Sequence, residues 1–118
     1  MRYLCQVIIP EGTIEAMSPE EKEQLDRDSL AYDRVLEAEG AMVRAEALES
    51  PKTAITVRVR KGETLTTDGP FTEAKEYLGG FILVTARDMN EAIRIAAGIP
   101  LAKYGSIEVR PVMMFGDE

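Results

Sequence analysis

Twice along this sequence, an apolar run typical of a β-strand is followed by the start of a helix. Residues 3–9 form the first run, and a Ser-Pro-Glu-Glu capping sequence follows at 18–21. Residues 78–86 form the second run, and an Asp-Met-Asn-Glu capping sequence follows at 88–91. Both runs are apolar on both faces, which is typical of strands buried on both sides of a sheet. This order favours an α+β fold in which helices cover one face of an antiparallel sheet.

The periodicity of the other segments completes the order of elements. We expect β-strands at 3–9, 41–48, 53–60, 64–67, 78–86 and 107–115, and helices at 19–39 and 89–97. This order is the split βαβ pattern of a ferredoxin-like domain, βαββαβ, with a β-hairpin inserted in its middle. The hairpin turn is predicted at 61–63. No linker interrupts the chain, so we expect residues 1–118 to form a single domain.

Apolar stripes predict the buried face of each helix. The stripe of the first helix is Leu25, Ser29, Tyr32 and Leu36. Ser29 is its one polar member. The expected buried face of the second helix is Met89, Ala92, Ile93 and Ala96. Two glycines at 79–80 predict a bulge or a close approach of two backbones in the strand before it.

Composition excludes several kinds of chemistry. The chain has no His and one Cys among its 118 residues. Without His there is no His-ligated zinc, no Ser-His or Cys-His nucleophile pair and no imidazole acid-base catalysis. A single Cys forms no intrachain disulfide, and its place in the first strand predicts a buried, inert thiol. We therefore expect neither a metal site nor a cofactor.

The net charge of -7 is concentrated in one place, because residues 11–39 carry ten acidic and three basic residues. An acidic chain without a basic run is a poor binder of nucleic acid, since phosphate contacts dominate that affinity. We interpret the acidic helix either as a solvated face or as a docking face for a basic partner. No run approaches the roughly 20 apolar residues of a membrane-spanning helix. The N-terminus is too short for a signal peptide and the Cys is unpaired, so a cytoplasmic location is expected.

The strands at 3–9, 78–86 and 107–115 are apolar on both faces, yet two helices cover only one face of a sheet. A bare apolar face of this size is an interaction surface. The sequence therefore predicts a homodimer in which sheet packs against sheet about a two-fold axis. The alternative is that the inserted hairpin, or the C-terminal residues Met114 and Phe115, folds back over the same sheet.

The most distinctive stretch lies at residues 66–76. Pro70 sets the direction of the chain, and Phe71 follows as a large apolar anchor. Asp68 has two interpretations. Its carboxylate caps the turn by accepting a hydrogen bond from the N–H two residues on, as in an Asx turn. Alternatively, it stands at the edge of a cleft as an acid, a base or a ligand acceptor.

This stretch resembles the signature of the DGPF-domain proteins of the YCII-related superfamily. The resemblance rests on Asp-Gly-Pro-Phe at 68–71, Thr-Glu-Ala-Lys-Glu at 72–76 and Leu-Gly-Gly-Phe at 78–81, and it extends over nearly the whole chain. It implies a dimeric α/β-barrel of ferredoxin-like protomers and a cytoplasmic bacterial protein of unknown function. In the superfamily, a His on the first helix is thought to face the Asp of the turn. Other members accompany extracytoplasmic-function sigma factors.

Carried over to this chain, the resemblance places Asp68 at the Asp of the signature and Ser29 where the His is expected. Ser29 then has two interpretations: its hydroxyl bonds the carbonyl four residues earlier, or it faces Asp68 and binds a polar ligand. A Ser-Asp pair has no base suited to activating the hydroxyl. Tyr32, one turn further on, either donates its hydroxyl into the same cleft or packs in the core.

Three hypotheses of function follow. The leading one is a dimer with little or no catalysis that binds a small molecule in a cleft lined by Asp68, Phe71, Ser29 and Tyr32. The second is an enzyme in which Asp68 is the catalytic acid or base for a small organic substrate. The third is a regulatory protein that docks a sigma factor through its acidic helix.

Overall fold

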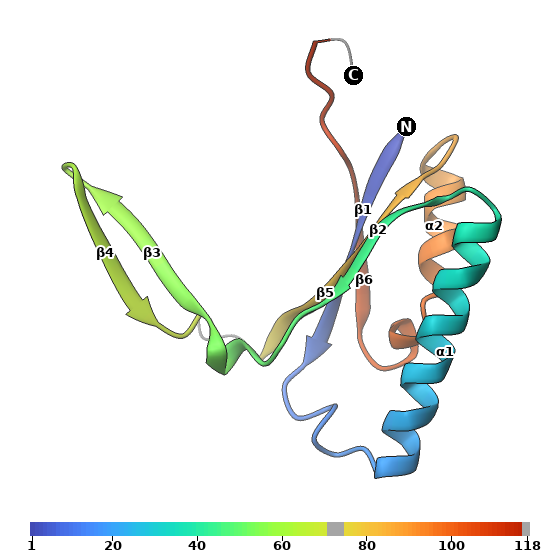
Figure 1. Cartoon of the computed structure of the whole chain (residues 1–118), viewed down its shortest axis with the longest axis horizontal. Coiled ribbons are helices and arrows are strands. Elements are labelled where there is room, and N and C mark those ends of the chain that lie inside the picture. The colour runs from blue at the N-terminus through green and yellow to red at the C-terminus, as the bar shows by residue number, and fades with distance from the viewer. Residues whose placement is uncertain (71–74, 117–118) are drawn as a thin grey trace.

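A computed structural model describes residues 1–70 and 75–116 of the chain. Two helices, α1 (Pro19–Ala38) and α2 (Met89–Ala97), cover one face of a four-stranded antiparallel sheet (Figure 1). The sheet has the order β2-β5-β1-β6, with β1 at Arg2–Pro10, β2 at Met42–Ala47, β5 at Glu76–Thr85 and β6 at Ser106–Pro111. This order confirms the expected ferredoxin-like α+β fold. No helix in the described ranges is long and apolar enough to cross a membrane.

The inserted hairpin forms a separate two-stranded sheet of β3 (Ile55–Arg60) and β4 (Glu63–Asp68). We call residues 55–68 the arm. It projects from the sheet on the side away from the helices (Figure 1). Lys61 and Gly62 both have positive φ, at 51° and 80°, as a two-residue hairpin turn requires, so the predicted turn is confirmed.

The helices begin where the capping sequences predict. Ser18 accepts a hydrogen bond from the N–H of Glu21, and the Glu21 carboxylate accepts one from the N–H of Ser18, which completes a capping box. At α2 only half of the expected box forms. Asp88 caps the N–H of Glu91, but the Glu91 carboxylate accepts from the N–H of Arg87 instead of that of Asp88.

The core lies between the sheet and the helices. Its buried apolar side chains are Tyr3, Cys5, Val7, Ile9, Leu36, Ile82, Val84, Ala86, Ala92, Ile95, Ala96 and Ile99. The buried face of α2 differs from the expectation, because Ile95 is buried whereas Ile93 is 53% exposed. Each residue of an α-helix is rotated by about 100° from the one before, so Ile93 points away from the helix face that carries Ala92 and Ala96.

Two features of the strands depend on their neighbours. The register of β1 against β5 shifts between Val7 and Ile8, which leaves Gly79 as the extra residue of a bulge. A Cβ on the adjacent Gly80 would lie 2.7 Å from the carbonyl oxygen of Glu46, so both effects predicted for the glycine pair are present. The last strand is predicted to reach residue 115 but ends at Pro111, and one further backbone bond, from the N–H of Val112 to the carbonyl of Arg2 at 2.9 Å, continues its pairing with β1.

Candidate functional site

Asp68 is exposed at the base of the arm, where β4 ends. An Asx turn at this position would need an N–H on Pro70, and proline has none. The turn is closed instead by other bonds: the N–H of Gly69 donates to the carbonyl of Ala54 at 2.7 Å, and the Thr56 hydroxyl donates to the carbonyl of Gly69 at 2.8 Å. Within residues 1–70 and 75–116 the Asp68 carboxylate has no hydrogen bond or ion pair.

Phe71, the predicted apolar anchor, lies outside the described residues. Ser29 is half-buried on α1, in the predicted stripe between the buried side chains of Leu25 and Leu36. Its hydroxyl has no hydrogen-bond partner among the described residues. The expected bond to the carbonyl four residues earlier is therefore not formed.

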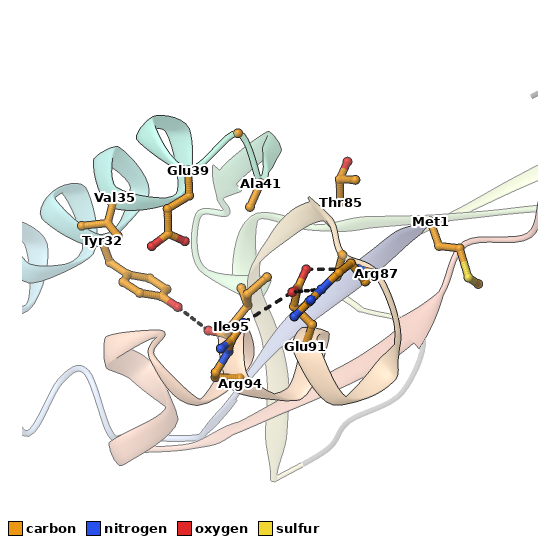
Figure 2. Close-up of a pocket in the computed structure, with 12 residues that line it drawn as sticks. Met1, Tyr32, Val35, Glu39, Ala41, Thr85, Arg87, Glu91, Arg94 and Ile95 are labelled. Atoms are coloured by element: carbon orange, nitrogen blue, oxygen red, sulfur yellow. Dashed lines mark hydrogen bonds and ion pairs between the residues drawn. The ribbon is translucent and has the colours of Figure 1, made fainter.

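Tyr32 is half-buried on α1, and its hydroxyl donates a 2.6 Å hydrogen bond to the carbonyl of Ile95 on α2. It lines an open groove of about 730 Å³ where the last turns of α1 meet the start of α2 (Figure 2). Burial raises the pKa of Tyr32, and the carboxylate of Glu39 raises it further. The phenol therefore stays protonated at neutral pH and acts as a donor.

Charged side chains of α2 occupy the middle of this groove (Figure 2). The Glu91 carboxylate accepts from the backbone N–H of Arg87 at 3.1 Å and from its Nε at 2.7 Å, and it lies 3.4 Å from Nη2 of Arg94. The hydrogen bonds from Arg87 lower the pKa of Glu91. The bonds from Arg87 close the loop before α2, and the two arginines against one glutamate leave this cluster a net charge of +1.

The face of the four-stranded sheet that the helices leave uncovered is apolar at its centre except for Gln6, and it is charged at both edges. One row across it reads Arg44, Leu83, Leu4 and Arg110, and the next row reads Glu46, Phe81, Gln6 and Glu108. We call these eight residues the open face. The four central side chains are half-buried and the four charged ones are exposed. The periodicity of the strands predicted this second apolar face.

The chain matches the YCII-related domain family over residues 1–116. It is a YCII-related protein. An uncharacterised protein of Rhizobium meliloti (strain 1021) is 36% identical to it over 117 residues, which cover 98% of this chain and 94% of that relative. The family resemblance expected from the Asp-Gly-Pro-Phe signature is confirmed.

Within one chain of this YCII-related protein, the three predicted site residues that the structure describes do not all come together. Ser29 and Tyr32 lie on α1, which covers one face of the sheet, whereas Asp68 lies on the arm, which projects on the opposite side (Figure 1). Within residues 1–70 and 75–116, no three acidic or Cys side chains gather to hold a metal ion. Sequence reasoning missed the Arg87–Glu91–Arg94 cluster, for which the only signal was the capping sequence at 88–91.

Proposed function

We propose that this YCII-related protein is a homodimer, open face against open face, that binds a small organic molecule with Asp68 as a hydrogen-bond acceptor. The observation that carries the proposal is the open face: a sheet surface with a largely apolar centre that the two helices leave uncovered. Packed sheets lie about 10 Å apart, which lets half-buried central side chains such as Leu83 and Phe81 interdigitate with those of a second copy.

The charged edges of the open face support a particular symmetry. Both arginines stand in one row and both glutamates in the next row. One choice of two-fold axis lies parallel to the sheet, perpendicular to the strands and midway between the two rows. It places Arg44 opposite the second copy's Glu46, and Glu108 opposite the second copy's Arg110. An axis along the strands would instead place Arg44 opposite Arg110. The first arrangement is self-complementary in charge, as an interface between identical copies requires.

The place of Asp68 supports binding at one end of such an enclosure. The arm leaves the sheet on the side of the open face (Figure 1), and Asp68 stands at its base. Ligand pockets occur preferentially in the mouths of barrels, where apolar walls meet a few polar groups. With no His in the chain, Asp68 has no imidazole to share a proton with, which favours binding over catalysis.

A thermal-shift screen against a broad panel of small metabolites tests the proposal. A ligand at 100 times its Kd adds about 2.7 kcal/mol to the free energy of unfolding. We expect a stabilising compound for the wild type whose effect is lost in Asp68→Asn and kept in Glu63→Gln, a matched change at the other end of β4. A compound turned over by the wild type and not by Asp68→Asn would indicate an enzyme.

Sedimentation equilibrium of the wild type tests the dimer separately. A mass of two chains at micromolar concentration is expected. A mass of one chain, or a panel without any stabilising compound, would contradict the corresponding half of the proposal. The acidic helix would then be the next surface to test, against protein partners.

A further inference from the structure

The arm carries an apolar face that no part of the chain within residues 1–70 and 75–116 covers. Ile55, Val57 and Val59 alternate along β3 and so point to the same side, with 63%, 59% and 59% of their surfaces exposed. The cross-strand partner of Ile55 is Asp68, which places the Asp68 side chain on this same face. We call these four residues the arm face.

An uncovered arm of this kind is unstable in water. A lone two-stranded hairpin is at best marginally stable, and it needs a further strand or another packed surface. The overall dimensions agree with a missing partner. The radius of gyration is 16.3 Å, whereas a compact domain of this length has about 13.5 Å. The arm and the chain beyond β6 both stand away from the sheet and helices and account for the excess (Figure 1).

The position of the arm indicates what covers it. Arg58 and Arg60 alternate with the apolar residues of β3 and so lie on the other side of the arm, which leaves Asp68 as the one charged member of the arm face. The arm face is therefore suited to an apolar surface that also offers a hydrogen-bond donor. The arm also projects on the side of the open face, so a copy packed on that face lies next to the arm (Figure 1).

We propose that the arm of each protomer packs its arm face on the body of the second copy, so that the two chains hold each other reciprocally. This inference rests on the proposed dimer and adds the arm to its interface. It also makes the ligand site a product of two chains, because Asp68 on the arm face is brought to the surface of the second copy. On this arrangement Asp68 need not lie near α1 of its own chain, because it contributes to a site on the second copy.

Interchain nuclear Overhauser effects decide the question in the wild-type protein. Dimers are assembled from an equal mixture of ¹³C-labelled and unlabelled chains, and an isotope-filtered spectrum is recorded for the methyl groups of Ile55, Val57 and Val59. We expect cross-peaks from these methyls to protons of the other chain. Cross-peaks to the same chain only would overturn the inference, whatever the variants show.

Two variants measure how much the arm contributes. Val57→Asp should weaken the dimer at least tenfold, whereas Ile93→Asp, at a similarly exposed aliphatic on α2, should change the dimer Kd less than twofold. A second variant lacks residues 55–68, so its result does not depend on whether a mutated arm folds. Ala54 and Gly69 can be joined directly, because the N–H of Gly69 already donates to the carbonyl of Ala54. We expect the same loss of affinity and an unchanged far-UV signal from the helices.

The outcomes separate this inference from the proposed function. A wild type that dimerises, with a dimer Kd unaffected by either arm variant, would overturn the role of the arm and leave the face-to-face dimer intact. A wild type that is monomeric at micromolar concentration would overturn both.

Discussion

The hydroxyl of Tyr32 on α1 and the carbonyl of Ile95 on α2, 63 residues apart in the sequence, share a 2.6 Å hydrogen bond. This bond joins the two helices on the covered side of the sheet. Of the two interpretations of Tyr32, a donor to a ligand or a residue packed in the core, the bond favours the structural one, because the hydroxyl already donates to the backbone.

Removal of this hydroxyl should have a modest cost. We expect Tyr32→Phe to lower the free energy of unfolding by about 1 kcal/mol. The loss stays small because the N–H of Gly98 also donates to the Ile95 carbonyl, which keeps one partner. Urea denaturation measures the change, and Tyr104→Phe, at a tyrosine exposed to solvent, is the control. Equal stability of the two variants would show that the bond contributes nothing.

Gly98 leaves room for the same tyrosine. A Cβ at position 98 would overlap the hydroxyl and ring of Tyr32. We expect Gly98→Ala to cost about 1 to 3 kcal/mol through overpacking. The same substitution in a Tyr32→Ala background should cost much less, as a double-mutant cycle in urea would reveal. An identical cost in both backgrounds would assign the effect to the backbone of Gly98 instead.

The Glu91 carboxylate should make stability depend on pH in acid. Its pKa is lowered chiefly by the backbone hydrogen bond from Arg87 and then by the side-chain bond from the same residue. A lowered pKa in the folded state means that the stabilisation is present above the ordinary value of 4.5 and is lost as the pH falls through the folded value.

Thermal unfolding between pH 7 and pH 3 tests this expectation. Glu91→Gln should be less stable than the wild type near neutral pH, and the difference should shrink as the pH falls below 4.5. Glu23→Gln, on the exposed side of α1, is the control and should show little difference at any pH. A difference between the wild type and Glu91→Gln that stays constant with pH would contradict the assignment.

Cys5 should be unreactive in the folded protein. Its side chain is fully buried, and burial raises the pKa of its thiol from 9.0 to about 11. Because the thiolate is the nucleophile, alkylation by iodoacetamide at pH 8 should be at least about 100-fold slower in the native protein than in urea. Mass spectrometry of timed samples gives both rates. A native rate within tenfold of the unfolded rate would mean that the first strand opens readily.

The sequence predicted what depends on neighbouring residues. The capping box of Ser18 and Glu21 closes within one helical turn, and the Lys61-Gly62 turn requires only the backbone angles of two residues. Strand periodicity likewise predicted both faces of the sheet, because alternate side chains point to opposite sides whatever lies beyond them. These local signals were enough for the order of elements and therefore for the ferredoxin-like fold.

Tertiary structure alone decided what depends on distant partners. The last strand ends at Pro111 instead of residue 115, the Glu91 carboxylate accepts from the N–H of Arg87 instead of that of Asp88, and Ile95 replaces Ile93 in the core. Tyr32 and Asp68 were assigned to one cleft, yet they lie on opposite sides of the sheet (Figure 1). Sequence periodicity predicts on which face of its own helix or strand a side chain lies. Only the packing of elements far apart in the chain determines what that face meets.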